Sequence, residues 1–411
     1  MSDFYDKLET REPEQRQKAL LEAIRTQVAH VKANTGAYKE LLAGIDAEDL
    51  IDAVSYSKLP LTRKSELIEL QNNNRPFGGL TAARLIPHTH IYASPGPIYE
   101  PGYALADFWR LARSLHATGI RPGDLVHNSF SYHLTPAGMM LESGALALGC
   151  TVIPAGVGQT ELQVQTIADL KPQAYVGTPS FLKIILEKAD ELKADASSIS
   201  KALVGGEALP PPLRDGLSER GIRVQQCYAT ADLGLIAYES SAQEGLIIDE
   251  GVYLEILRPG SGDLVADGEV GEVVVTSLNP EYPLIRFATG DLSAIMPGVS
   301  PCGRTNRRIK GWMGRADQTA KVRGMFIHPE QVIKVIKRHP EIARARLVID
   351  WVDAADAITL QCETTSEDES LVSAVVESIR EICKLRGDVE LLSADSLPND
   401  GKVIDDIREY D

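Results

Sequence analysis

Three short segments toward the end of the sequence carry side chains that could act on a negatively charged substrate. Asp291 ends the string RFATGD, a glycine-containing turn in which a carboxylate can accept hydrogen bonds from hydroxyl groups. Arg315, in WMGRADQ, could reach an anionic group, and Lys402, in PNDGKVID, could bridge two of them from a glycine-flanked loop. Taken singly, they could equally be a turn aspartate, a surface salt bridge and a solvated lysine, so only their order along the chain gives them weight.

That order identifies a family resemblance. The string IRFATGDLSAIMPG is followed by CGRTNRRIKGWMGRADQTAKVRGMFIHPEQVI and then by LPNDGKVIDDIRE. The chain resembles the phenylacetate–coenzyme A ligase branch of the adenylate-forming superfamily, which includes acyl-CoA synthetases, luciferases and adenylation domains. The resemblance runs from about residue 50 onward and is strongest from 120 to 335, where RPGDLVHNSFSY, GTPSFLKII and GGEALPPPLRD follow the branch in order.

The resemblance implies an ATP-dependent acid–thiol ligase. Such an enzyme activates an aryl or small carboxylic acid as an acyl-adenylate and passes the acyl group to coenzyme A. Hydroxide is a poor leaving group and adenylate a good one, so the protein must hold the adenosine, align the reactants and neutralise phosphate charge. The implied cofactors are ATP (or AMP and the acyl-adenylate), Mg²⁺ and coenzyme A.

The family's site residues carry over position by position. The resemblance assigns Asp291 to the ribose hydroxyls, Arg315 to the ribose or a phosphate, and Lys402 to catalysis between the acid and the α-phosphate. Asp317 matches the hinge on which a small domain turns between two poses. A coenzyme A site exposed in the second pose would use the segment KVRGMF, through Lys321, Arg323 and Gly324.

Two further groups of residues match the adenine and acyl sides of the family's site. Tyr228 would stack on adenine, and Asp232, in YATADLG, takes the place of a glutamate that binds magnesium. A glycine pair would let the flat adenine ring approach the backbone, in the segment Gly205, Gly206 and Glu207. A cluster rich in aromatic residues follows an expected strand and comprises Phe130, Ser131, Tyr132 and His133. It could form an acyl pocket for a flat or apolar acid, or it could pack in the core.

The phosphate loop departs from the family. The family has a Ser/Thr/Gly run ending in Gly-Lys, whose amides wrap phosphates, whereas this chain has HIYASPGPIYEPGY. Ser94 and Gly96 remain as nucleotide-binding candidates, there is no lysine, and Glu100 has the wrong charge for a phosphate cradle. Three prolines also remove backbone donors: Pro95, Pro97 and Pro101.

This departure leaves alternatives open. The loop could be rebuilt with ATP use retained, or the chain could use another nucleotide state, such as a preformed acyl-adenylate. It could also be a non-catalytic homologue that binds a nucleotide or acyl-CoA. Within the enzyme class, the acceptor could be a carrier-protein thiol or an amine instead of coenzyme A. A Rossmann-type oxidoreductase is disfavoured because no GxGxxG follows an early strand.

Composition excludes several classes. The 411 residues include 42 basic and 58 acidic ones, a formal net charge of −16, whereas a nucleic-acid partner needs a basic face. The charged start and the lack of an apolar run of about 18 residues predict no signal peptide and no membrane contact.

Five scattered cysteines predict a reducing, cytoplasmic setting. Only Cys302 lies where some relatives bind zinc, and one sulfur cannot make that site, so we expect no zinc. Relatives are often homodimers.

The elements that must position these residues follow from the hydrophobic pattern. Residues 13–36 predict a helix that ends at Gly36. From about 124 to 230, apolar strands alternate with helices, which favours an α/β fold with mostly parallel, helix-flanked sheets. Short β-rich runs after 250 predict a subdomain. We expect a large adenylate-forming domain over 1–316 and a small mobile α+β domain over 317–411.

Overall fold

The computed structural model confirms the α/β class and divides the chain into two compact units. The first comprises 1–254, 275–288 and 296–312, and the second comprises 255–274, 289–295 and 313–411. Within the described ranges, no helix is long and apolar enough to cross a membrane. The structure describes residues 3–82, 87–94, 98–260, 262–316, 318, 320–322, 325–352, 355–366 and 368–408.

The large sheet has the strand order β14-β15-β10-β9-β8-β7-β6-β4-β5. Five of its strands pair in parallel. They are β4 (Leu125–Asn128), β5 (Thr151–Pro154), β6 (Ala174–Gly177), β7 (Lys201–Val204) and β8 (Arg223–Thr230). Every residue of β6 is buried, as expected for a parallel strand covered on both faces. The remaining strands are β9 (Gly234–Glu239), β10 (Leu246–Ile248), β14 (Ile295–Met296) and β15 (Arg308–Ile309).

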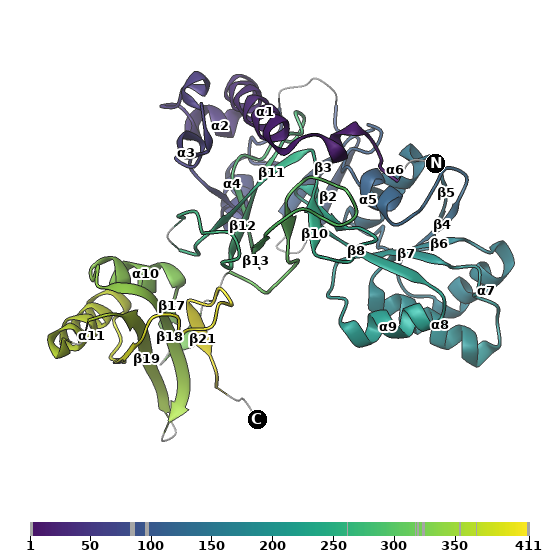
Figure 1. The fold of residues 1–411 in the computed structure, drawn as a ribbon. Helices are drawn as coiled ribbons and strands as arrows, with labels where there is room; N and C mark the ends of the chain where they lie inside the picture. Colours follow the sequence, from purple (N-terminus) through teal and green to yellow (C-terminus); the bar gives the residue numbers. More distant parts are fainter. Residues whose placement is uncertain are drawn as a thin grey trace. The chain divides into compact units, whose positions relative to one another are not determined.

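Helices cover both faces of the parallel strands, which confirms the alternation predicted from the sequence (Figure 1). One face carries α7 (Thr160–Leu170), α8 (Pro179–Leu192) and α9 (Pro211–Glu219), and the other carries α5 (Ala112–Ala117) and α6 (Ala137–Ala147). Small residues let α6 approach α5 closely, since a Cβ at Gly144 would lie 2.8 Å from the backbone nitrogen of Ala112. The chain adds β5 on one side of β4 and then crosses back to add β6, β7 and β8 on the other side. Doubly wound sheets bind ligands at such a switch point, which here lies between β4 and β6.

Two smaller sheets complete the β-rich part of the chain. One has the order β1-β13-β12-β11, with β1 (Thr62–Arg63), β11 (Val252–Leu257), β12 (Gly271–Ser277) and β13 (Phe287–Ser293). The other is the antiparallel pair β2 (His90–Ser94) and β3 (Ile98–Gly102). All seven residues of β12 are buried, so this strand contributes to the core on both of its faces.

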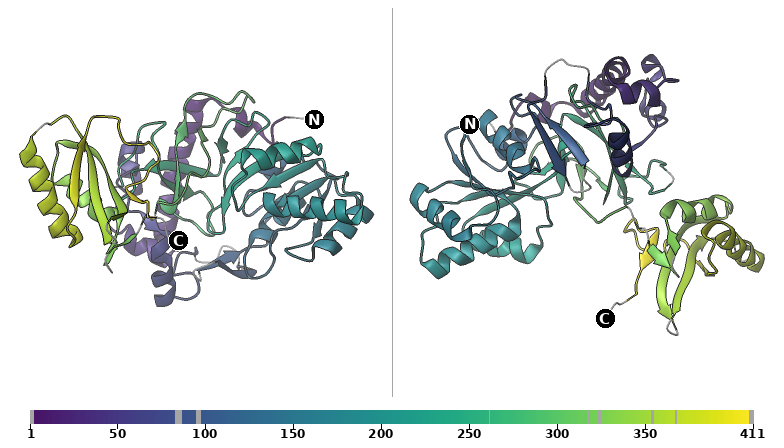
Figure 2. Two further views of the ribbon diagram at one scale, coloured as in Figure 1. Left: turned by 90° about the horizontal axis from the view of Figure 1, so that it is seen from below. Right: turned by 180° about the vertical axis from the view of Figure 1, so that it is seen from behind.

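The C-terminal segment forms a four-stranded sheet in the order β20-β19-β18-β21. Its strands are β18 (Ile342–Val352), β19 (Ala355–Thr364), β20 (Asp388–Leu392) and β21 (Ile404–Asp406). A hairpin of β16 (Ala320–Val322) and β17 (Met325–Ile327) precedes them. Helices α10 (Pro329–Lys337) and α11 (Glu369–Cys383) lie on one face of the sheet (Figure 2), and a shared apolar core that includes Val332, Leu347 and Val375 joins them to it.

The N-terminal segment is helical, with one difference from the prediction. Helix α1 (Pro13–Asn34) ends before Gly36, and Gly36 begins α2 (Gly36–Leu41). The Thr35 side chain causes the break, because its oxygen accepts a hydrogen bond from the Tyr38 amide and caps α2. The other short helices are η1 (Lys7–Thr10), η2 (Ala47–Asp49), α3 (Ala53–Tyr56), η3 (Lys64–Glu66) and α4 (Leu67–Asn73).

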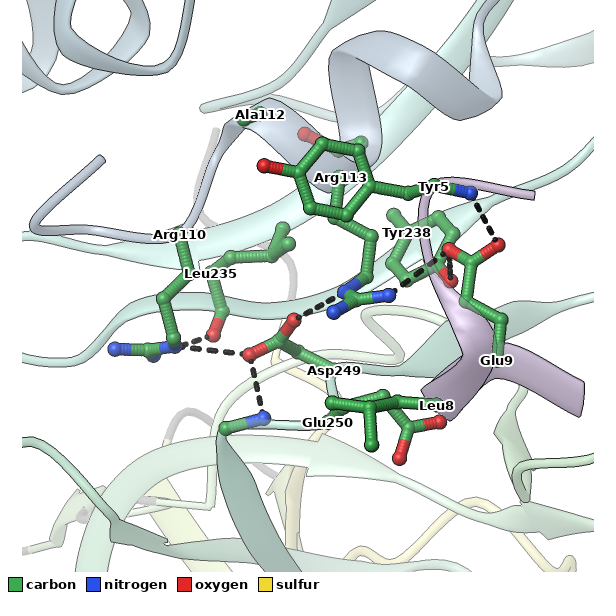
Figure 3. Close-up of polar contacts among 12 residues, drawn as sticks. Tyr5, Leu8, Glu9, Arg110, Ala112, Arg113, Leu235, Tyr238, Asp249 and Glu250 are labelled. Atoms are coloured by element: carbon green, nitrogen blue, oxygen red, sulfur yellow. Dashed lines mark hydrogen bonds and ion pairs between the residues drawn. The ribbon is translucent and has the colours of Figure 1, made fainter. Parts of the chain in front are cut away.

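A buried ion network attaches η1 to the core of the first unit (Figure 3). The Arg113 guanidinium lies 2.7 Å from Asp6, 3.2 Å from Glu9 and 3.4 Å from Asp249, and its side chain is only 9% exposed. The Tyr238 hydroxyl donates to Glu9 at 2.9 Å. The Glu9 and Asp249 side chains are removed from water, so each depends on its cationic and hydroxyl neighbours.

Replacing Arg113 should therefore unfold the first unit more easily. We expect Arg113→Met to lower the free energy of unfolding by about 3–5 kcal/mol, because it leaves buried carboxylates without a partner. Urea denaturation followed by circular dichroism measures the change. The matched control is Arg220→Met, whose ion pair with Asp190 is exposed and should contribute little. Equal stability of the two variants would contradict this assignment.

Candidate active site

The residues that follow β4 lie at the switch point of the large sheet. Asn128, buried at the end of β4, accepts from the Phe130 amide and donates to the Tyr132 hydroxyl at 2.8 Å. The Tyr132 hydroxyl donates in turn to Glu142. Its ring lies directly over Gly138, where a Cβ would come within 2.7 Å of it. Tyr132 is thus held in place, Phe130 and Ser131 are half-buried, and His133 is exposed.

The glycine pair after β7 lies beside this segment. Gly206 has a φ of +79°, and a Cβ there would be 3.7 Å from the Phe130 ring. A Cβ at Gly205 would be 3.1 Å from the Cys227 carbonyl oxygen. The carboxyl ends of β4, β7 and β8 therefore bring together two groups of residues that the sequence keeps about 75 positions apart.

The other adenine-side candidates have structural partners. The Glu207 carboxylate accepts a hydrogen bond of 2.6 Å from the Ser180 amide, at the start of α8, where a negative charge is favourable. Tyr228 is half-buried in β8, next to a β-bulge, and opposes Ala237 of β9. Both remain predicted nucleotide contacts.

Asp232 lies in the turn between β8 and β9 and is nearly buried. Its Oδ2 is 2.7 Å from the Lys64 ammonium. Lys64 belongs to η3 and is distant in sequence, and no sequence motif marked it. Its position beside Asp232 gives the first unit a cation near the rewritten phosphate loop, which has no lysine of its own.

Glu100 is buried against Asp232. Its carboxylate accepts a hydrogen bond of 2.7 Å from the Ser94 hydroxyl, and its residue is 1% exposed. Burial, and then the negative charge of Asp232, raise the pKa of Glu100 to about 8. The sequence singled out Glu100 for its charge, but only the fold shows that this charge faces another carboxylate. Gly96 lies outside the described residues.

Asp291 and Arg315 meet in the second unit, as a common role requires. Their side chains form an ion pair of 3.0 Å, and their backbones form a β-bridge. Gly290 has a φ of +76°, which strains any residue with a side chain, and a Cβ there would lie 2.7 Å from the Arg315 guanidinium. The Arg315 side chain is 49% exposed and that of Asp291 13%, so the guanidinium is accessible to a ligand.

Lys402 lies on a loop of the same unit that is held on both sides. Its ammonium is 2.6 Å from Asp405 and is half-exposed. Gln318 donates to the Gly401 carbonyl at 3.0 Å and accepts from the amides of Val403 and Ile404. Lys402 also lines a cavity of about 270 Å³, together with Arg258, Lys337, Arg344 and Arg346.

Asn399 fastens the start of this loop. Its side-chain amide donates to the Gly268 carbonyl at 3.1 Å and accepts from the Val270 amide at 3.1 Å. Gln318 and Asn399 were both missed at the sequence level, because an amide side chain that binds backbone leaves no pattern in composition or spacing. Together they fix the loop that carries the predicted catalytic lysine.

The remaining predicted site residues are described only in part. Asp317, Arg323 and Gly324 lie outside the described residues, and Lys321 is placed only by its backbone, in β16 opposite Phe326. Cys302 accepts from the Ser300 hydroxyl at 3.0 Å and lies 3.7 Å from Arg304. Across the described ranges, no group of three or more His, Cys, Asp or Glu side chains could hold a metal ion.

Comparison with known proteins gives consistent matches. Residues 131–279 match the family of AMP-binding enzymes. The chain is 32% identical to the phenylacetate-coenzyme A ligase of Aromatoleum evansii, over 84% of this chain and 81% of that one. It is 30% identical to the Thermus thermophilus ligase of the same name, over 93% and 90%. A crystal structure of 2-hydroxyisobutyryl-CoA ligase in the postadenylation state, in complex with 2-HIB-AMP, has a TM-score of 0.73 at 25% identity and covers 98% of this chain and 92% of that one.

The raised pKa of Glu100 predicts a pH-dependent stability. A carboxyl group whose pKa is higher in the folded state favours folding below its unfolded value near 4.5, and this contribution is lost as the pH rises through about 8. In metal-free buffer, we expect the Tm of the wild type to fall from pH 5 to pH 9 more steeply than that of Glu100→Gln, whose amide cannot ionise. Parallel Tm profiles for the two proteins would count against this prediction.

Proposed function

The chain belongs to the phenylacetate–coenzyme A ligase family of adenylate-forming enzymes, and from this premise we propose that it activates an aryl or small carboxylic acid. As a member of the family it is an ATP-dependent acyl-CoA ligase that works through an acyl-adenylate. The observation that carries the residue assignments is the Asp291–Arg315 pair in its glycine turn, in the same unit as the clamped loop of Lys402.

In the first half-reaction, an oxygen of the acid attacks the α-phosphorus of ATP and the bond to the β-phosphate oxygen breaks. The Asp291 carboxylate accepts hydrogen bonds from the ribose hydroxyls, and Arg315 turns toward ribose or phosphate. The Lys402 ammonium leaves Asp405 and bridges the acid and the α-phosphate, where negative charge accumulates in the transition state. Pyrophosphate leaves.

In the second half-reaction, the coenzyme A sulfur attacks the acyl carbon and AMP leaves. We propose that residues 317–411 form a lid that turns on Asp317 and removes Lys402 between the two steps. The turned lid would present Lys321, Arg323 and Gly324 to coenzyme A. This division of labour explains why one lysine can serve only the adenylation step.

The acyl and adenine groups would occupy the carboxyl edge of the large sheet. The proximity of Gly206 to Phe130 supports adjacent adenine and acyl subsites, with Tyr228 and Glu207 on the adenine side. Ser131, Tyr132 and His133 complete the proposed acyl pocket. Ser94 is proposed to contact the phosphates.

Mg²⁺ would neutralise phosphate charge at Asp232. The fit is supported by the Asp232 Oδ1 atom, which is buried and has no hydrogen-bond partner among the described residues. A carboxylate oxygen of this kind is the ligand that Mg²⁺ prefers.

Acid-dependent release of pyrophosphate from ATP tests the proposal. With a panel of aryl and short-chain acids, we expect release that falls by about 100-fold or more in Lys402→Ala, because a charge-stabilising donor is lost. The control is Lys334→Ala, an exposed lysine of α10. Coenzyme A and a holo-carrier protein are supplied in separate reactions, and the one that becomes acylated is the acceptor. The absence of release with every acid would refute the proposed substrate class.

Gln318 should act as a positioning residue for Lys402. Gln318→Ala removes every hydrogen bond from this side chain to the loop, and we expect kcat for adenylation to fall about tenfold while the KM for acid changes little. Gln318→Glu keeps the acceptor oxygen and loses the donor, so its kcat should lie between those of the wild type and Gln318→Ala. An unchanged kcat in both variants would show that the loop holds itself.

A further inference from the structure

Glu100 and Asp232 come from different elements and share one buried site in the first unit. Glu100 lies in β3 and is 1% exposed, and Asp232 lies in the β8–β9 turn and is 5% exposed. Asp232 acts electrostatically on Glu100, and each of the two side chains has one buried oxygen without a hydrogen-bond partner among the described residues. Two neighbouring carboxylates in a buried site need more positive charge than the single ammonium of Lys64 supplies.

In each carboxylate, one oxygen accepts a hydrogen bond and the other has no partner among the described residues. Ser94 occupies Oε1 of Glu100, and Lys64 occupies Oδ2 of Asp232. Oε2 of Glu100 and Oδ1 of Asp232 are buried and have no hydrogen-bond partner among the described residues. A buried acceptor without a partner costs free energy, and here two of them occur in neighbouring groups.

A third oxygen belongs to the same surroundings. The hydroxyl of Tyr282 is buried and has no partner in the described part of the chain. Burial, and then the charges of Asp232 and Glu100, raise the pKa of Tyr282. The site is therefore surrounded by oxygen atoms, which are ligands that hard divalent cations select over softer metals.

We propose that Glu100 and Asp232 together bind one divalent cation, Mg²⁺ or Mn²⁺, through Oε2 and Oδ1, before any nucleotide is present. The inference rests on the proposed function and deepens it, because Glu100 belongs to the segment that replaces the family's phosphate loop. Mg²⁺ sites built from one or two carboxylates plus substrate phosphates are common in phosphoryl-transfer enzymes.

Charge accounting explains how the rewritten loop can still accept ATP. When both carboxyl groups are ionised, as a cation site requires, they and Lys64 have a net charge of −1, which repels phosphate. A bound divalent cation changes this to +1, so the same residues attract phosphate. Glu100 then acts as a metal ligand, and the cation and Lys64 together replace the backbone amides and lysine that the prolines and Glu100 displaced.

The test is direct binding of Mn²⁺ to the full-length, metal-stripped protein without nucleotide, measured from the loss of the free Mn²⁺ signal in electron paramagnetic resonance. We expect one site per chain in the wild type and at least about tenfold weaker binding in Glu100→Gln and in Asp232→Asn. Glu187→Gln, an exposed carboxylate of α8, is the control and should bind as the wild type does. Circular dichroism and Tm in EDTA establish that each variant is folded.

A second variant gives an effect of opposite sign. Lys64→Met removes a positive charge next to the cation, so Mn²⁺ should bind several-fold more tightly, while the KM for ATP should rise because the phosphates lose a partner. A variant that merely damaged the fold would weaken both. Tighter Mn²⁺ binding combined with a higher KM for ATP therefore supports the shared site.

The failure of this inference differs from the failure of the proposed function. If the wild type releases pyrophosphate but binds no Mn²⁺ without nucleotide, or if Glu100→Gln binds Mn²⁺ as the wild type does, the two-carboxylate site is overturned and the ligase assignment stands. If Mn²⁺ binds as expected and no acid supports pyrophosphate release, the site stands and the proposed substrate class fails.

Discussion

Parallel pairing of β4, β6, β7 and β8 is the constraint on which the first unit depends. Parallel strands must all return by crossover helices, so their carboxyl ends meet at one edge of the sheet. The segments after β4 and β7 are therefore neighbours, although α6, β5, α7, β6 and α8 lie between these two strands along the chain. Gly206 can approach Phe130 only because both strands end at this edge and because glycine tolerates its positive φ.

Buried charge is arranged differently in two places of the same unit. Around Arg113, each carboxylate faces a cation or a hydroxyl donor, and the network serves to hold η1 in place. Around Asp232, one lysine faces two carboxylates, and two carboxylate oxygens have no hydrogen-bond partner among the residues that the structure describes. In the first arrangement every carboxylate has a cationic or hydroxyl partner. In the second, one ammonium group faces two carboxyl groups, so a bound cation would balance the negative charge.

The second unit applies a related principle to a loop. The role proposed for Lys402 requires its ammonium to leave Asp405 and its loop to hold a defined position. The side-chain amides of Gln318 and Asn399 bind backbone groups and fix the loop, while the lysine side chain stays half-exposed. A fixed backbone that carries a half-exposed side chain positions a charge without burying it.

The sequence by itself determined the fold class, the alternation of strands and helices and the family. These follow from local hydrophobic periodicity and from ordered motifs such as RFATGD and DGKVID, which need no knowledge of distant contacts. The resemblance assigned Asp291 and Arg315 to one nucleotide site, but the ion pair between them appears only in the structure. The break at Thr35 was missed, because a single capping hydroxyl decides it.

Only the tertiary structure decided what Glu100 faces. From the sequence it was a charge in the wrong place, because its neighbours along the chain are prolines and apolar residues. Folding brings it near Asp232 and places the Lys64 ammonium 2.7 Å from the Oδ2 atom of Asp232. Electrostatic energy depends on distance and burial, not on sequence separation, so no local pattern could reveal that this charge, Lys64 and Asp232 form one site.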